Sequence, residues 1–187
     1  MTILRSPTTY IRTLVAADAQ EMLALRERNR DFLKPWEPLK QPEYLTLGVQ
    51  QLEIQRSDQE WSTDRRYAFG IFDAASDELA GHISLSNIVR GAWQNATLGY
   101  FVGEEYNGRG HCTNAVSLAV EFAYETARLH RVQAATMLSN AASARVLKKN
   151  GFAFEGMARR YLRINGHWED HNVYSLTVEE WRGPISI

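Results

Sequence analysis

The chain is poor in groups that could cross-link it, since Cys112 is the one cysteine among 187 residues. A single thiol excludes an internal disulfide and a metal site built from several cysteines. Such usage is typical of a protein that works in a reducing compartment, so we expect this one in the cytoplasm. The sequence also lacks internal repeats and low-complexity segments.

An excess of charge of either sign is also missing. The chain has 21 Lys and Arg against 22 Asp and Glu, which gives a net charge of -1 at pH 7 and a pI near 6.5. A nucleic-acid-binding protein ordinarily carries a basic face, so this balance argues against a nucleic-acid partner. No run approaches the roughly 20 apolar residues of a membrane helix, and we expect neither a membrane span nor a leader segment.

The residues that are present predict one α/β domain over residues 1–187, because 44% of them are hydrophobic and enough to fill one core. Hydrophobic periodicity predicts the order β-α-α-β-β-β-α-β-α-β-β, a mixed sheet with helices on its faces. We expect strands at 10–15, 67–72, 79–89, 95–102, 131–137, 152–163 and 168–177, and helices from residue 18 and at 45–61, 112–124 and 141–149.

Local signals fix several boundaries. Asp18, with Glu21 three residues later, is the pattern of a capping box, and we expect it to cap the first helix. Prolines on both sides of Trp36 predict a loop. Asn165 and Gly166 predict the tight turn of a C-terminal hairpin. The helix at 112–124 implies that the strands before and after it are parallel and joined by a right-handed crossover.

A candidate anion site lies where the apolar strand 98–102 leads into Asn-Gly-Arg-Gly-His-Cys-Thr at 107–113 and opens a helix. The first N–H groups of a helix have no intrahelical partner and lie at its positive end, so they bind phosphate well. Gly108 and Gly110 tolerate unusual backbone angles and let a ligand approach the main chain. The alternative is that both glycines only make a strand-to-helix turn.

These segments, together with Asn140-x-x-Ser143 and Asn150-Gly-Phe152, resemble the GNAT acyl-CoA N-acyltransferases. The segments 32–37, 159–166 and 168–171 are similar to the RimJ/RimL-like ribosomal-protein-alanine N-acetyltransferases, in particular to the RimJ side. The likeness covers nearly the whole chain. It implies a GNAT-like fold and the transfer of an acetyl group from acetyl-CoA to a primary amine, foremost the N-terminal α-amine of a protein such as a ribosomal protein.

The resemblance also implies where acetyl-CoA binds. Its pantetheine arm would pair with a strand that splays from its parallel neighbour, and a peptide N–H there would face the thioester carbonyl. Asn140 would meet the pantetheine amide, although a plain helix N-cap calls for the same residue type. The family's Gln/Arg-x-x-Gly-x-Gly/Ala loop departs here at its first and last places. The strand residues are Tyr100, Phe101 and Val102, and the phosphate loop is Asn107, Gly108, Arg109, Gly110, His111, Cys112 and Thr113.

The leaving thiolate of CoA needs a proton or a hydrogen-bond donor. Many family members supply a tyrosine near the end of the helix at 141–149, but Leu147 stands there and cannot donate. Ser143 matches the serine that Rim-type enzymes are thought to use, and we expect it in this role. The general base is left open, because a glutamate of a RimL-type relative falls at Leu162. The candidates are Glu104, Glu105, Asp170 and His171, each with a solvated charge or a hairpin partner as the alternative.

The expected acceptor site comprises Trp36, Trp168, Asp170 and His171, since the likeness extends through these residues. Cys112 fits the apolar stripe of its helix better than a nucleophile, so we expect direct transfer. We expect no metal, because His167 and His171 lie about 13 Å apart on an extended strand. Two other functions stay open, namely acetylation of a small amine such as an amino acid or antibiotic, and non-catalytic acyl-CoA binding by a sensor. The oligomeric state is open as well, a homodimer included.

Overall fold

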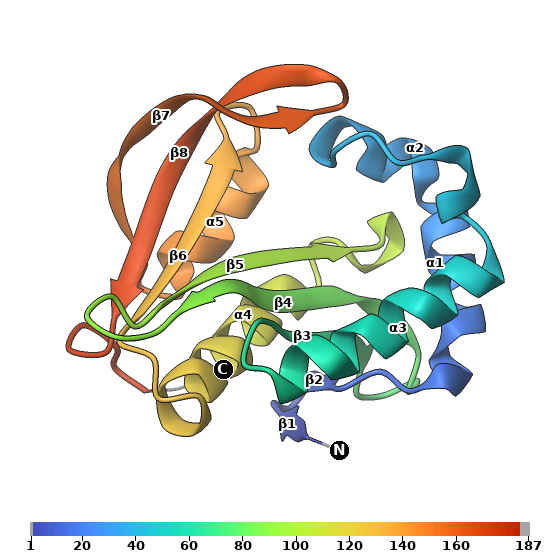
Figure 1. The fold of residues 1–187 in the computed structure, drawn as a ribbon, viewed down its shortest axis with the longest axis horizontal. Coiled ribbons are helices and arrows are strands. Elements are labelled where there is room, and N and C mark those ends of the chain that lie inside the picture. The colour runs from blue at the N-terminus through green and yellow to red at the C-terminus, as the bar shows by residue number, and fades with distance from the viewer. Residues whose placement is uncertain (1, 184–187) are drawn as a thin grey trace.

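The structure is a computed structural model that describes residues 2–183, so Met1 and the last four residues of the expected domain lie outside it. Its strands form one sheet in the order β1-β2-β3-β4-β5-β6-β8-β7 (Figure 1). The strands are β1 (Ile3–Arg5), β2 (Thr9–Arg12), β3 (Tyr67–Asp73), β4 (Leu79–Val89), β5 (Asn95–Val102), β6 (Arg131–Met137), β7 (Ala153–Ile164) and β8 (His167–Thr177). The helices are α1 (Ala19–Arg28), α2 (Arg30–Leu33), α3 (Leu47–Ser62), α4 (His111–Glu121) and α5 (Ala141–Lys149).

The pairing confirms the mixed sheet. Strands β1 to β5 are antiparallel, β5 and β6 are parallel, and β8 pairs antiparallel with both β6 and β7. The expected crossover and C-terminal hairpin are therefore present. One strand was missing from the prediction, because β1 has three residues and an exposed-intermediate-exposed pattern that is too short to show a period.

Asp18 stands at the N-cap position of α1, as expected, but its side chain makes no cap hydrogen bond to that helix, so the predicted capping box is wrong. Its carboxylate accepts the N–H of Val15 at 2.7 Å and pairs with Arg12 at 2.7 Å. Glu21 accepts the N–H of Leu79 at 2.6 Å instead of folding back on its own helix. Both carboxylates tie the start of α1 to the sheet. Elsewhere the expected loop around Trp36 contains a 3₁₀ turn, and α4 ends at Glu121 with a π-helical turn after it.

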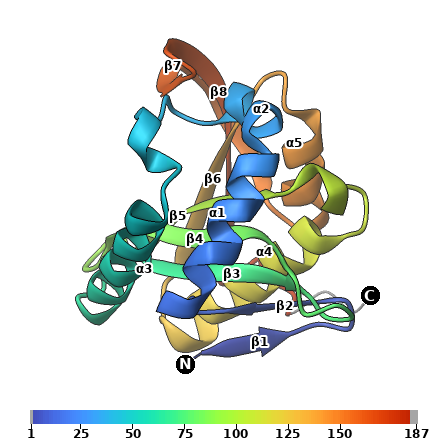
Figure 2. The ribbon, with the colours of Figure 1, turned by 90° about the vertical axis from the view of Figure 1, so that its right-hand side faces the viewer.

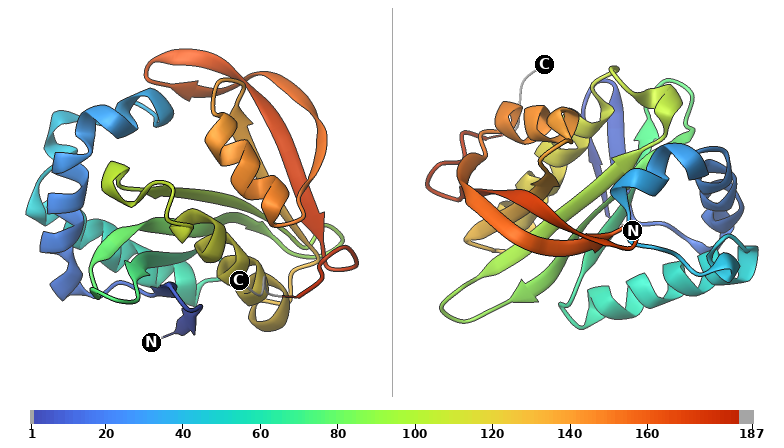
Figure 3. Two further views of the ribbon diagram at one scale, coloured as in Figure 1. Left: turned by 180° about the vertical axis from the view of Figure 1, so that it is seen from behind. Right: turned by 90° about the horizontal axis from the view of Figure 1, so that it is seen from above.

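Helices cover both faces of the sheet. On one face, α1 packs against β4 and α3 against β3, and the two helices touch each other. On the other face, α4 crosses β2 to β5 and α5 packs against β6 and α4. Figure 2 shows α1 in front of the strands, and the right view of Figure 3 separates the α1/α3 face from the α4/α5 face. The core between these layers includes the fully buried Phe69, Ile83, Leu85, Val116 and Leu147.

The sheet opens between its two parallel strands. Strands β5 and β6 pair from Asn95–Arg131 to Leu98–Ala134, although each strand continues for at least three more residues. Above this gap the β7–β8 hairpin arches toward α2 (Figure 1), and the Asn165 N–H donates to the Glu37 carbonyl at 2.9 Å. Strand β5, helices α1 and α2, the hairpin and β6 thus form a ring around the gap.

Candidate active site

A cavity of about 320 Å³ lies where β5 and β6 separate. Its wall is formed by β5, β6, α5, the β7–β8 hairpin and the segment that follows α2. The residues that matter below are Trp36, Pro38, Gly99, Tyr100, Ala135, Thr136, Asn140, Ser143, Leu162, Ile164 and His171.

Main-chain groups of β5 face this gap. The Gly103 N–H donates to the Ala80 carbonyl at 2.9 Å, which continues the pairing of β5 with β4. Because opposite residues of an antiparallel pair alternate between bonded and non-bonded, Phe101 and Gly99 also direct their main-chain groups toward β4. The N–H and C=O groups of Tyr100 and Val102 therefore point to the side from which β6 has departed. This confirms the splayed geometry that the resemblance implied.

The cavity passes through the sheet from one face to the other. Tyr100 reaches the α4/α5 face, where its hydroxyl contacts Ser143, whereas the Phe101 ring lies under Arg26 of α1 at 4.4 Å. On the β6 side of the cavity, Thr136 points to the same face as the buried Ala134, two residues before it. His171 lies opposite Met137 in the β6–β8 register, so its side chain is on the other face of the sheet. Ligands can therefore meet in the gap from opposite faces.

On the α4/α5 face, the N-terminus of α5 brings two expected residues to the cavity. The Asn140 side-chain oxygen accepts the Ser143 N–H at 3.0 Å and caps α5, so the N-cap role is real. Its amide NH₂ group remains as the donor for a ligand. The Ser143 hydroxyl lies 2.9 Å from the Tyr100 hydroxyl. The Thr136 hydroxyl is buried and has no hydrogen-bond partner among residues 2–183, which suits a wall that receives a polar ligand.

On the α1/α3 face, His171 is 3% exposed and borders the cavity. Its Nδ1 lies 2.9 Å from the Glu169 carbonyl oxygen, and a carbonyl can only accept. Nδ1 therefore carries the hydrogen, which leaves Nε2 as an acceptor in the neutral ring. Trp36 and Pro38 close this side together with Leu162 and Ile164 of the hairpin.

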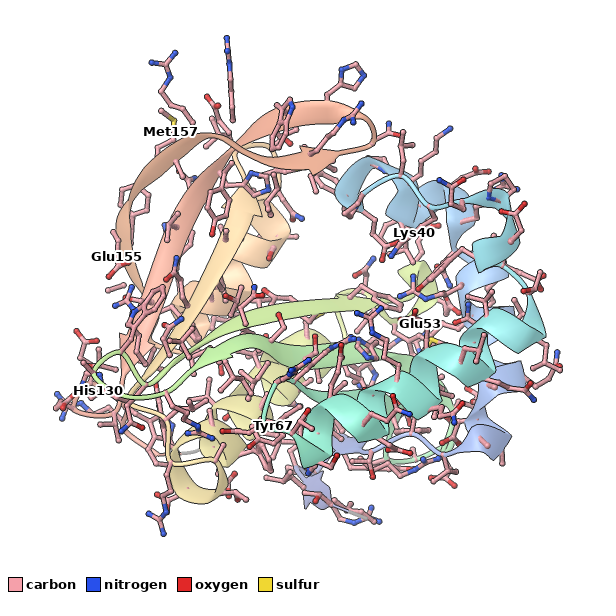
Figure 4. The ribbon with its side chains drawn as sticks, in the orientation of Figure 1. Lys40, Glu53, Tyr67, His130, Glu155 and Met157 are labelled. Carbon is pink, nitrogen blue, oxygen red and sulfur yellow. The ribbon has the colours of Figure 1, made fainter. Side chains whose placement is uncertain are left out.

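A second, smaller cavity of about 60 Å³ lies between α1 and α3. His82 borders this cavity. Its pKa lies well below the ordinary value, because the side chain is buried and the positive charges of Arg66, Arg26 and Lys40 are nearby. Lys40 and Glu53 lie on this helical side of the molecule, away from Met157 and Glu155 of β7 (Figure 4). The neutral His82 is separated from the gap by the Phe101 ring, with the two ring centroids 6.2 Å apart.

The glycine loop has the geometry of an anion site. Gly108 and Gly110 have φ angles of +75° and +87°, and a Cβ on Gly108 would meet no atom within 4 Å. The first main-chain bond of α4 runs from the Asn114 N–H to the Gly110 carbonyl, which leaves the preceding N–H groups of the helix without an intrahelical acceptor. Arg109 is exposed beside them. The loop therefore fits phosphate groups through its main chain.

Two residues of this loop turn their side chains away from solvent. His111 is buried, with Nδ1 2.9 Å from the Thr9 hydroxyl and Nε2 3.3 Å from Asp73, so only its main chain can serve a ligand. Burial raises the pKa of the Cys112 thiol to about 12, so it is a thiol at neutral pH. A thiolate nucleophile is not available there.

Several expected residues are not brought to the cavity. Glu104 is exposed, and Glu105 pairs with Arg28 at 2.6 Å. Asp170 accepts the N–H of Arg160 at 2.7 Å within a bulge of β7. Trp168 is 62% exposed on the hairpin. Of the candidate bases and acceptor contacts, only His171 and Trp36 border the cavity.

Within residues 2–183, no group of three or more His, Cys, Asp and Glu side chains is placed to hold a metal ion. In the same described range, no helix combines the length and the apolar character that crossing a membrane requires.

Comparison with known proteins gives one consistent family. The family model of the acetyltransferase (GNAT) domain matches residues 9–153. The probable N-acetyltransferase YjcK of Bacillus subtilis (strain 168) is 42% identical over 93% of this chain and 96% of its own length. The ribosomal protein uS5-alanine N-acetyltransferase of Escherichia coli (strain K12) is 32% identical over 91% and 88%. The structure of Mycobacterium smegmatis RimJ in complex with CoA-disulfide has a TM-score of 0.91 and 27% identity, and the match covers 98% of this chain and 89% of that one.

Proposed function

The chain belongs to the GNAT acetyltransferases and is an N-acetyltransferase, and on that premise we propose that its acceptor is the N-terminal α-amine of a protein such as a ribosomal protein. One observation carries the proposal: the cavity that passes through the sheet has the acid candidate Ser143 on one face and the base candidate His171 on the other. An acetyl donor and an amine can then react directly, with both bound at once.

The α4/α5 face supplies the donor site in this proposal. The main chain of 107–113 holds the phosphates of acetyl-CoA, and Asn140 together with the main chain of Tyr100 and Val102 holds its pantetheine arm. The Tyr100 N–H faces the gap and meets the carbonyl oxygen as negative charge develops on it. Loss of such a donor typically slows catalysis by roughly 10² to 10³.

The α1/α3 face supplies the acceptor site. The amine enters under Trp36 and the hairpin and approaches Nε2 of His171, which takes one proton as the new C–N bond forms. The C–S bond then breaks with its electron pair on sulfur, and the Ser143 hydroxyl donates a hydrogen bond to that sulfur. The thiolate finally takes a proton from water, and His171 returns its own proton to solvent.

A histidine suffices as base because of the acceptor's own pKa. An N-terminal α-amine with a pKa near 7.8 is roughly 15% neutral at pH 7, whereas a lysine at about 10.4 is only about 0.04% neutral. The α-amine therefore starts some hundreds-fold ahead of a lysine side chain. This difference favours a protein N-terminus over a lysine as the acceptor.

The test is release of CoA thiol from acetyl-CoA with three kinds of acceptor. These are peptides that begin with alanine or serine, lysine peptides with blocked N-termini, and small amines. We expect turnover with the free N-termini. Turnover with small amines alone would make the protein a small-molecule acetyltransferase, and CoA binding without turnover would favour a sensor.

A further inference from the structure

The Tyr100 side chain joins β5 to α5 through a hydroxyl–hydroxyl contact with Ser143. Its hydroxyl lies 2.9 Å from the Ser143 Oγ and 3.3 Å from the Ser143 carbonyl oxygen. Both residues border the cavity on the α4/α5 face. Burial raises the pKa of the Tyr100 phenol, so the group keeps its hydrogen at neutral pH. Tyr100 is thus a permanent donor beside Ser143.

Two hydrogen-bond arrangements are available to these hydroxyls. If Tyr100 donates to the Ser143 carbonyl, the Ser143 hydrogen points back at Tyr100 and is lost to a ligand. If Tyr100 donates to Ser143 Oγ, the serine hydrogen is free to turn into the cavity. The distances favour the second arrangement, because the 3.3 Å from the Tyr100 hydroxyl to the Ser143 carbonyl oxygen is longer than a good O–H···O hydrogen bond of about 2.5 to 3.0 Å, whereas the 2.9 Å to Ser143 Oγ is within that range. In addition, a carbonyl within a helix accepts the N–H of the residue four positions on. The Ser143 carbonyl therefore does not need Tyr100 as a donor.

We propose that Tyr100 is a positioning residue that donates to Ser143 Oγ and so directs the Ser143 hydrogen at the departing sulfur of CoA. The inference rests on the proposed function. In this step the C–S bond breaks with its electron pair on sulfur, and Ser143 and Tyr100 stabilise that charge through two hydrogen bonds in series. Neither hydroxyl loses its proton, and the thiolate is later protonated by water.

The second hydroxyl comes from Tyr100 of β5, because Leu147 of α5 has no group that could donate a hydrogen bond. Leu147 is fully buried in the core, so the helix position that carries a donor in many relatives serves packing here. Tyr100 supplies a phenol to the same end of the cavity from the strand side. Because its main-chain N–H also faces the gap, one residue sets the position of two donors.

The kinetic test compares Tyr100→Phe, Ser143→Ala and the double variant, with Tyr124→Phe as the matched control. Tyr124 is also buried and donates a hydrogen bond to the Leu176 carbonyl at 2.6 Å, and neither residue borders the cavity. We expect Tyr100→Phe to lower kcat roughly three- to tenfold with little change in KM for acetyl-CoA, and Ser143→Ala to lower it roughly ten- to a hundredfold. The double variant should be no slower than Ser143→Ala, and Tyr124→Phe should keep the wild-type kcat.

A binding test on the same proteins gives a readout that a merely structural tyrosine would not move. Calorimetry compares CoA with CoA that lacks the thiol sulfur, desulfo-CoA. We expect wild type to prefer CoA several-fold, Ser143→Ala to lose most of that preference, and Tyr100→Phe to lose a smaller part of it. An unchanged preference in Tyr100→Phe, or losses in kcat that multiply in the double variant, would overturn the proposal. A wild type that releases no thiol with any amine would instead refute the proposed function, while the binding comparison would still decide the role of Tyr100.

Discussion

The Cys112 thiol shows how two local effects compete at one residue. A helix N-terminus ordinarily favours a thiolate, but burial dominates here and raises the pKa of this thiol to about 12. We therefore expect Cys112→Ala to keep kcat within about twofold. Initial rates with both substrates varied should give intersecting lines, as a reaction with both substrates bound requires. Parallel lines together with an inactive variant would indicate a covalent acetyl-thiol intermediate instead.

His171 carries the acceptor side of the proposal. Its Nδ1 hydrogen is held by the Glu169 carbonyl, which fixes the ring with Nε2 as the acceptor. We expect His171→Ala to lower kcat/KM for a peptide N-terminus by roughly 10² to 10⁴, the usual range for a general base, and added imidazole to restore part of it.

The control for that variant is His167→Ala, which alters an exposed histidine of the same hairpin. Its kcat/KM should match wild type. A His171→Ala protein that retains full activity, or one that merely unfolds at lower temperature and does not respond to imidazole, would contradict the assignment.

At the scale of one element, the start of α4 depends on Gly110. Its φ of +87° lies in the left-handed region, where a Cβ costs about 1 kcal/mol. We expect Gly110→Ala to lower the free energy of unfolding by about that amount and to weaken CoA binding, because the loop must shift to relieve the strain. Urea unfolding and calorimetry with CoA measure the two effects.

Gly48 in the first turn of α3 is the matched control, since a Cβ at this position would have no atom within 4 Å and the residue lies in an ordinary helix. Gly48→Ala should raise stability by a few tenths of a kcal/mol to about 1 kcal/mol and leave CoA affinity unchanged. Equal losses of CoA affinity in both variants would show that the effect is not local to the α4 loop.

Most elements could be predicted from the sequence because each has a strong local signal. Asn165-Gly166 marked the hairpin, and the apolar stripe from residue 112 marked α4. The start of α1 was predicted to within one residue, but the role of the Asp18 side chain was not, because its pairing with Arg12 does not follow from spacing along the chain. The prediction missed β1 for a similar reason. Its three residues form a strand because they pair with β2, and they are too few to show an alternating pattern of their own.

The candidate site was only partly predictable. The glycine loop, Asn140 and Ser143 follow from local motifs, and the structure brings the last two to the cavity. The pairing of Tyr100 with Ser143 depends on how α5 settles against the gap, which joins residues 43 positions apart. Carboxylates such as Asp170 looked suitable by type, but the bulge of β7 engages that side chain.

For the whole molecule, acid stability should depend on the Arg12–Asp18 pair. Burial alone would raise the pKa of Asp18, but hydrogen bonds from Arg12 and the Val15 N–H outweigh it and the pKa is lowered. Because the folded pKa lies below the unfolded value of about 3.9, this stabilisation is full above about pH 4 and is lost as the pH falls through the folded pKa.

We expect Asp18→Asn to lower the free energy of unfolding by about 3 kcal/mol at pH 7, because it leaves Arg12 partly buried without its partner. The difference from wild type should shrink steadily below pH 4. Denaturant unfolding at several pH values measures it, with Glu105→Gln as a control that breaks an exposed pair. A gap between Asp18→Asn and wild type that stays constant down to pH 2 would exclude this linkage.

The ring around the gap has a topological consequence for inhibitors. Strands β5 and β6 meet at Leu98 and Ala134, and Asn165 joins Glu37 on the opposite side, so a molecule spanning both faces of the sheet is encircled by the chain. A conjugate with CoA at one end and a peptide at the other has to thread one end through the hole or wait for the hairpin to detach. Such a compound should associate slowly and dissociate more slowly still. While it is bound, it should also keep the hairpin from detaching.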